Sequence, residues 1–157
     1  MLIKATLKND PWIKDLEKWL QPKHKTVMMS NIKFISYDAY NAAQQLQDAV
    51  FKSDQSKNNF YIIDEAHNFI RNVYQNIVRG DAEGIYKAYK HIQDDLRSNR
   101  KTKLAVLSAT PAINQPFELG VLFNLMRAGT FPESEGDFLD RYVSNDGVLR
   151  PDRVTEF

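Results

Sequence analysis

The sequence predicts an α/β fold in which a parallel β-sheet carries helices on both faces, and three features of the chain indicate it. Two apolar runs, at residues 60–63 and 104–107, are continuous rather than alternating, which is typical of strands that are buried on both sides. Segments of helix-forming composition separate the candidate strands. No hairpin signal joins any two of these strands, so they are expected to pair in parallel.

The first strand is expected in the apolar run of residues 1–5, before a turn-like stretch in which Asp10 precedes a proline. The apolar positions that follow have the spacing of an amphipathic helix: Trp12, Ile13, Leu16, Trp19 and Leu20. Pro22 lies just past the expected end of this helix. We expect the helix to cover a face of the sheet, with both tryptophans on its inner side.

The second strand is expected at residues 32–36, and a helix is expected from Ala39 to about Lys52. Residues 53–59 are polar and are expected to form a loop. The third strand, residues 60–63, runs directly into Asp64. A carboxylate is therefore expected at the end of a buried strand.

Residues 68–100 are rich in helix formers but are interrupted near residues 79–84, so two helices with a turn between them are expected. The fourth strand is expected at residues 104–107. A further helix is expected from Phe117 to Arg127, with Gly129 in the position that favours glycine after a helix end.

The composition of the 157 residues is ordinary for a soluble globular domain, with 43% hydrophobic and 26% charged residues. The formal net charge of +1 gives no global basic signature, so nucleic-acid binding has to be argued from local features. There is no cysteine for a disulfide or a thiolate metal site, which fits a reducing compartment. No signal peptide or membrane-spanning apolar run is found, so an intracellular protein without a membrane partner is expected.

Polar side chains are expected at the ends of four strands: Thr6, Ser36 with Tyr37, Asp64 with Glu65, and Ser108 with Thr110. In an open parallel sheet the carboxyl ends of the strands meet at one edge, where ligands bind. Adjacent carboxylates at that edge suit metal-assisted nucleotide hydrolysis, in which one holds Mg²⁺ and the other orients and deprotonates water. Asp64 fits the first role and Glu65 the second.

A structural alternative is that Asp64 and Glu65 only cap the following helix, since carboxylates stabilise helix N-termini. The longer pattern favours the catalytic role. Asp-Glu-Ala-His at residues 64–67 follows one buried strand, and Ser-Ala-Thr-Pro at residues 108–111 follows the next. This combination is more specific than a carboxylate pair alone.

These two segments resemble motifs II and III of the superfamily 2 helicases, whose motif II in this form is the DEAH box. The resemblance implies an ATPase that uses ATP and Mg²⁺, with Asp64 as the metal-positioning residue and Glu65 as the general base. It also implies that His67, Ser108 and Thr110 couple the nucleotide site to nucleic acid and to a partner domain. Outside such a motif, a lone His67 would more often be a surface or core histidine.

A narrower resemblance, to the Snf2-like pattern after motif III, is carried by residues 112–119 and 122–132. Together with residues 64–69 and 138–143, it resembles in particular the Snf2-related nucleoside triphosphatases of large DNA viruses, of the poxvirus early-transcription type. Within that family Ala5-Thr6-Leu7 with Trp12 resembles motif Ia, and Ser36 with Tyr37 resembles motif Ib. Both segments are then expected to touch the nucleic-acid backbone, although a plain strand end at Thr6 and a helix cap at Ser36 are equally open.

Two departures from the family pattern matter. The chain contains no Gly-x-x-x-x-Gly-Lys-Ser/Thr phosphate loop, and it lacks the motifs of a second motor domain. We therefore expect a fragment that covers motifs Ia to III, the second half of the first RecA-like domain, at residues 1–143. Residues 144–157 are polar and are expected to form a tail or linker. The truncation is expected to leave the strand at residues 104–107 as an unpaired edge.

The function that we expect is an ATP-driven nucleic-acid translocase or helicase-like motor, with DNA favoured over RNA and a role in viral transcription. Its expected partners are nucleic acid, an upstream phosphate-loop segment and a second RecA-like domain. A viral protein of this kind is expected in the cytoplasm of the infected cell or in the virion. The alternative is a non-catalytic scaffold derived from such an ATPase, although a scaffold needs no general base at Glu65.

Two weaker features are interpreted as structural rather than as nucleic-acid contacts. The basic clusters at residues 23–25 and 97–103 are more typical of solvated loops than of phosphate contacts. Tyr86 and Tyr89 stand at helical spacing and are expected to pack in the interior rather than to stack on bases.

Overall fold

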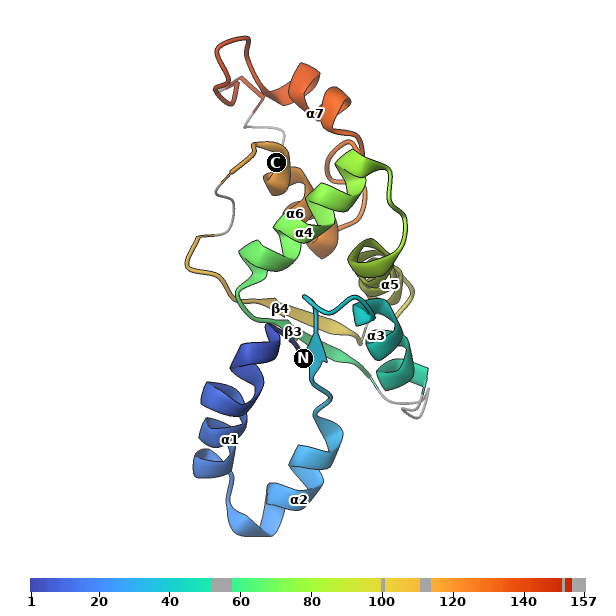
Figure 1. The fold of residues 1–157 in the computed structure, drawn as a ribbon. Coiled ribbons are helices and arrows are strands. Elements are labelled where there is room, and N and C mark those ends of the chain that lie inside the picture. The colour runs from blue at the N-terminus through green and yellow to red at the C-terminus, as the bar shows by residue number, and fades with distance from the viewer. Residues whose placement is uncertain (52–57, 100, 111–113, 151, 154–157) are drawn as a thin grey trace.

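In a computed structural model of the chain, four strands form one parallel sheet with helices around it (Figure 1). The strands are β1 (Leu2–Ile3), β2 (Ile35–Ser36), β3 (Phe60–Ile63) and β4 (Lys103–Val106). The structure describes residues 1–51, 58–99, 101–110, 114–150 and 152–153. Most of the loop expected at residues 53–59 lies outside the described residues, as do residues 111–113 and the last four residues. The α/β fold with a parallel sheet, of the kind found in RecA-like helicase domains, is confirmed.

The strands lie in the order β2-β1-β3-β4. The longest pairing joins β3 to β4, in a register that sets Phe60 opposite Lys103 and Ile63 opposite Val106. In the described part of the chain β4 has a neighbour on one side only, so it is an edge strand, as expected from the sequence. The free backbone groups of such an edge can pair with another strand.

The helical elements follow the strands in an alternating order. They are the short helical turns η1 (Ala5–Leu7) and η2 (Lys8–Ile13), then α1 (Lys14–Trp19), α2 (Pro22–Asn31), α3 (Ala42–Phe51), α4 (Ala66–Arg79), α5 (Gly84–Ser98), α6 (Phe117–Met126) and α7 (Glu135–Tyr142). The two helices expected between β3 and β4 are α4 and α5. The helix expected at residues 117–127 is α6, and Gly129 adopts a left-handed backbone (φ 78°) just beyond its end.

The core of the domain lies where α4, α5 and α6 pack on one another beside the sheet. Helix α4 buries one apolar stripe, which includes Phe69, Ile70 and Val73. The neighbouring α5 buries Tyr89 and Ile92 on its inner side. Because each stripe recurs every three or four residues, both helices could be predicted from sequence periodicity.

The expectation that the first amphipathic helix covers the sheet is wrong in the described structure. Helices α1 and α2 bury no residue, and Trp19 is 77% exposed. Figure 1 shows this pair extending away from the sheet, on the side opposite α4 and α6. In the strand order, β2 lies on one side of β1, whereas β3 and β4 lie on the other. Right-handed crossovers therefore place the β1–β2 connection, with α1 and α2, on the face of the sheet opposite the connections through α3 and through α4 with α5.

The sequence favours a solvated loop for the basic cluster at residues 23–25. Instead these residues lie in a ten-residue helix whose first position is Pro22. Proline is favoured at that position because its missing N–H would have no helical partner there. The proline that was expected to end one helix therefore begins another.

The C-terminal part of the described chain packs through aromatic rings. The ring of Phe138 in α7 lies 5.3 Å from Phe117 in α6, 5.4 Å from Phe131 and 5.3 Å from Tyr142, measured between ring centroids. Gly120 makes room for two of these rings, since a β-carbon there would lie 3.1 Å from both Phe117 and Phe138. Beyond Tyr142 the chain turns back, and the Arg150 N–H donates to the Tyr142 carbonyl at 2.8 Å.

Candidate active site

Backbone hydrogen bonds bring the ends of the strands together at the carboxyl edge of the sheet. The Asp64 N–H donates to the Leu2 carbonyl at 3.0 Å, which ties the end of β3 to β1. The Ala66 N–H donates to the Leu107 carbonyl at 2.9 Å, which ties the start of α4 to the end of β4. The segments that resemble motifs II and III are therefore neighbours, as expected for parallel strands.

Glu65 makes the turn from strand to helix with a left-handed backbone conformation, at φ 48° and ψ 48°. It is the only described residue other than glycine with positive φ. The turn directs its own N–H to Asp64 Oδ1, at 3.0 Å. Its side chain remains 45% exposed, so a water molecule can reach the carboxylate.

His67 lies between the two motifs. Its Nδ1 is 3.1 Å from Ser108 Oγ and 3.3 Å from Glu65 Oε2, and its Nε2 is 2.9 Å from Asn68 Nδ2. In the tautomer with its proton on Nδ1, the ring accepts from the Asn68 amide at Nε2. That proton faces both Ser108 and Glu65, so the histidine joins the carboxylate of the first motif to the hydroxyl of the second.

Ser108 also organises the chain that follows it. Its Oγ accepts a hydrogen bond from the Thr110 N–H at 3.2 Å, while Thr110 itself is exposed. The structure therefore brings together Asp64, Glu65, His67 and Ser108, with Thr110 at the rim. Pro111, the last residue of the motif, lies outside the described residues.

The segment that resembles motif Ib reaches the same edge from β2. Tyr37 is 1% exposed, donates from its hydroxyl to the Glu65 carbonyl at 3.4 Å, and packs against the ring of Phe69. Burial and the nearby charges of Asp38 and Asp64 raise the pKa of the Tyr37 hydroxyl above its usual range, so it stays a donor. Because the Tyr37 side chain is buried, any contact of this segment with nucleic acid is confined to its backbone and to the half-buried Ser36.

Thr6, in the segment that resembles motif Ia, is exposed in η1 and not at a strand end. This segment is tied to the end of β2, because the Ala5 N–H donates to Asp38 Oδ1 at 3.2 Å. The two segments predicted to touch nucleic acid therefore lie side by side.

Trp12 belongs to the segment that resembles motif Ia, but its contact with Asp64 is not predicted from the sequence. Its indole N–H donates to Asp64 Oδ2 at 2.7 Å, although the helical pattern assigned Trp12 to the inner face of a packed helix. A sequence signal was available, since the polar end of a buried tryptophan usually finds a hydrogen-bond partner. The pattern alone could not show which residue that partner would be.

Asp64 can serve as one ligand of a divalent cation but not as a complete site. The described residues contain no group of three or more histidine, aspartate or glutamate side chains arranged to hold a metal. Mg²⁺ commonly takes one or two carboxylates from a protein and its remaining ligands from nucleotide phosphates and water. A partly exposed carboxylate at the sheet edge fits such a nucleotide-borne ion.

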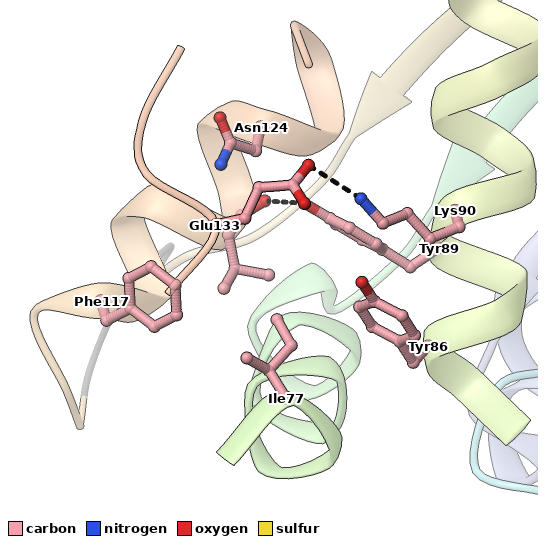
Figure 2. A pocket seen from close by; sticks show the side chains of 8 residues that line it. Ile77, Tyr86, Tyr89, Lys90, Phe117, Asn124 and Glu133 are labelled. Carbon is pink, nitrogen blue, oxygen red and sulfur yellow. Dashed lines mark hydrogen bonds and ion pairs between the residues drawn. The ribbon is translucent and has the colours of Figure 1, made fainter. Parts of the chain in front are cut away.

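Two hollows elsewhere on the molecule are not lined by any of these residues. One, of about 10 Å³, has room for no more than a water molecule and lies among α4, α5 and α6 (Figure 2). The Lys90 ammonium lies 2.9 Å from a carboxylate oxygen of Glu133, and Figure 2 marks this contact with a dashed line. The Tyr89 hydroxyl donates to the Val121 carbonyl. Tyr86 and Tyr89 stack on each other in this region, which confirms the packing role expected for them. The second hollow, of about 190 Å³, lies between α5 and the end of α6.

None of the helices in the described ranges is long and apolar enough to cross a membrane. A comparison with models of known protein families finds no match.

Comparison with curated proteins finds viral relatives. The chain is 43% identical to a protein of Acanthamoeba polyphaga mimivirus that is provisionally named as an ATP-dependent RNA helicase, with all of this chain and 21% of that protein aligned. It is 27% identical to nucleoside triphosphatase I of Choristoneura biennis entomopoxvirus, over 99% of this chain and 23% of the relative. It is 29% identical to nucleoside triphosphatase I of Melanoplus sanguinipes entomopoxvirus, over 96% and 23%.

The chain thus spans between a fifth and a quarter of the length of these relatives. Their names agree with the helicase and nucleoside triphosphatase class that motifs II and III indicate.

Proposed function

We propose that this chain forms the catalytic-carboxylate part of the first RecA-like domain of an ATP-dependent nucleic-acid motor. The observation that carries the proposal is the cluster at the carboxyl ends of β3 and β4, where His67 lies between Glu65 and Ser108. Such a cluster joins a base for water activation to a residue on the neighbouring strand. Relatives named as a helicase and as nucleoside triphosphatases support the same class of enzyme.

In this proposal Asp64 holds the Mg²⁺ that accompanies ATP, and Glu65 is the general base. The metal, when bound, neutralises charge on the transferring phosphoryl group. Glu65 orients the attacking water and takes its proton, a role that its exposed carboxylate permits. The hydrogen bond from the Glu65 N–H to Asp64 Oδ1 holds the Asp64 carboxylate against the backbone of the turn that carries Glu65.

The finer part of the proposal is a Snf2-like motor that moves on duplex DNA in viral transcription. It rests on the resemblance carried by residues 112–132 and on the adjacency of the η1 and β2 segments, where Thr6 and Ser36 would meet the nucleic-acid backbone. The mimivirus relative carries RNA helicase in its name, so stimulation by RNA is a necessary comparison. ATP turnover measured with duplex DNA, single-stranded DNA and RNA distinguishes these ligands.

The experiments on activity require what we call the complete motor, a protein that joins this chain to a phosphate-binding loop and a second motor domain. In the complete motor we expect His67→Ala to reduce the stimulation of ATPase by nucleic acid at least about fivefold, a size common for coupling between sites. Basal ATPase should fall less, because His67 contacts Glu65 and Ser108 without replacing either. Steady-state ATPase with and without nucleic acid measures both quantities.

The matched control for this variant is His24→Ala, which removes an exposed histidine from α2. It should leave the ratio of stimulated to basal activity unchanged. An equal loss of basal and stimulated activity in His67→Ala would contradict a coupling role and would point to a direct part in chemistry.

For the chain by itself we expect neither tight ATP binding nor sustained hydrolysis. Affinity in P-loop enzymes comes mainly from backbone N–H groups of a glycine-rich loop and from its lysine, and this sequence has no such loop. Asp64 and Glu65 place negative charge near a polyanion, which leaves Mg²⁺ as the main attraction. Isothermal calorimetry with Mg-ATP and a phosphate-release assay test this, with the complete motor as the positive control.

A dissociation constant in the micromolar range, equivalent to about −8 kcal/mol, would overturn the assignment of this chain as an incomplete nucleotide site. Sustained turnover by the pure chain would do the same. We also expect the isolated chain to self-associate through the edge strand β4, which sedimentation at several concentrations would detect.

A further inference from the structure

The contact between Trp12 and Asp64 joins two parts of the chain that are far apart in sequence. Trp12 lies in η2, directly after the exposed η1 segment that carries Thr6. Its indole nitrogen is 2.7 Å from Asp64 Oδ2, a short distance for a hydrogen bond from a neutral N–H. An indole nitrogen has only this one proton to donate, so the contact has a single possible direction.

Both oxygens of Asp64 are thereby held. Oδ1 accepts from the Glu65 N–H at 3.0 Å, and Oδ2 accepts from Trp12. Each carboxylate oxygen offers about two acceptor positions, so each keeps one that is open to a cation. The two donors fix the plane of the carboxylate and leave its outer edge free.

The segment that bears Trp12 is not anchored in the core. Neither η1 nor η2 has a buried residue, and the Ala5 N–H reaches across to Asp38 at the end of β2. Apart from its own chain neighbours, the hydrogen bonds of this segment thus lead to Asp38 on one side and to Asp64 on the other. A displacement of the segment would carry the indole N–H with it and release one side of the Asp64 carboxylate.

We propose that Trp12 is a positioning residue for Asp64 and that it makes the orientation of this carboxylate depend on the η1–η2 segment. The inference rests on the proposed function, because it takes Asp64 as the metal-holding group and η1 as a nucleic-acid contact. Nucleic acid that binds at η1 then acts on the metal ligand through the Trp12 indole. This route is separate from the one through His67 and Ser108, which acts on Glu65.

The first test uses the chain as it is, by NMR of the indole N–H groups. The chain has two tryptophans, and Trp19 is 77% exposed, so it serves as an internal control. Asp64→Ala should shift the Trp12 indole resonance and leave that of Trp19 in place. Asp64→Asn, which retains one carbonyl acceptor, should give a smaller shift.

Manganese supplies a second readout in the same spectra. Added Mn²⁺ should broaden the Trp12 indole resonance before that of Trp19, because a metal on Asp64 lies close to the Trp12 ring. Asp64→Ala should remove this difference. A Trp12 resonance that ignores Asp64→Ala would overturn the inference without touching the assignment of Glu65.

The functional test uses Trp12→Phe in the complete motor, which keeps an aromatic ring and removes the N–H. Turnover should fall at least about tenfold, the scale for a lost hydrogen bond to a charged group. The KM for ATP should stay within about twofold, while the Mg²⁺ concentration for half-maximal activity rises, a pattern that a general loss of folding would not give. Trp19→Phe is the matched control and should leave both parameters unchanged.

Turnover of Trp12→Phe within twofold of the unsubstituted motor would overturn the positioning role. This outcome can be told apart from failure of the proposed function. If Glu65→Gln also retained full turnover, the whole site would be misassigned. A silent Trp12→Phe beside an inactive Glu65→Gln would remove only the role of Trp12.

Discussion

Glu65→Gln in the complete motor is expected to lower ATP turnover at least about a hundredfold, the lower end of effects seen when a general base is removed. The substitution keeps the size of the side chain and takes away the group that accepts the proton from water. ATP binding should persist, because the phosphate-binding loop of the complete motor and the Asp64 carboxylate proposed to hold the metal are unchanged. Single-turnover hydrolysis and a nucleotide-binding measurement separate these two effects.

The matched control is Glu83→Gln, which changes an exposed glutamate that pairs with Lys87 on α5. Exposed ion pairs of this kind contribute little to stability, so activity should stay within about twofold. Near-normal turnover of Glu65→Gln would remove the catalytic assignment. It would favour the alternative that the chain is a scaffold derived from an ATPase.

Phe138→Ala is expected to destabilise the domain by about 3–5 kcal/mol, the usual cost of deleting a fully buried phenylalanine ring. Phe138 is 1% exposed, and its ring lies between those of Phe117 and Phe131. Because a domain of this size has a total stability of only about 5–15 kcal/mol, a large part of it should be lost. Urea unfolding of the chain, followed by circular dichroism, measures the change.

Phe123→Ala is the control for this prediction. Phe123 is 43% exposed and its ring contacts that of Phe131, so its removal should cost much less than that of the buried Phe138. A loss of stability for Phe138→Ala as small as that for Phe123→Ala would show that α7 is not part of the cooperative fold. It would also speak against an α/β domain that extends to residue 143.

The parts of the fold that the sequence predicts well are those with a strong local signal. Strand β3 is a continuous apolar run, β4 overlaps the apolar run at residues 104–107, and α4, α5 and α6 have apolar stripes or turn residues at their ends. The same logic failed for the apolar stripe from Trp12 to Leu20, because α1 within it buries no residue. Periodicity shows which face of a helix is apolar, but it contains no information on whether a partner surface lies within the chain.

The site divides in the same way. Asp64, Glu65, His67 and Ser108 could be named because they follow apolar runs in sequence, and parallel pairing brings such positions together. The burial predicted for the second of these runs is wrong, because β4 is an edge strand with no fully buried residue. Trp12 could be placed in the segment that resembles motif Ia, but its contact with Asp64 could not be predicted, because it crosses 52 residues and depends on where an irregular helical turn points the side chain. Helix α7 was missed although Ser134 caps it by accepting from the Asp137 N–H, a signal in a short polar stretch that a search for apolar stripes passes over.

The left-handed backbone at Glu65 bears on how this position can change over evolutionary time. The left-handed conformation costs about 1–2 kcal/mol for a residue with a β-carbon, almost nothing for glycine, and less for asparagine than for glutamate. For folding alone, random substitution would therefore drift toward glycine or asparagine, which would relieve the strain. A chain freed from catalysis has no reason to keep the costlier residue. Under the proposed role of Glu65 as general base, catalysis and folding favour different residues at this turn, and loss of catalysis would leave glycine or asparagine in place of the glutamate.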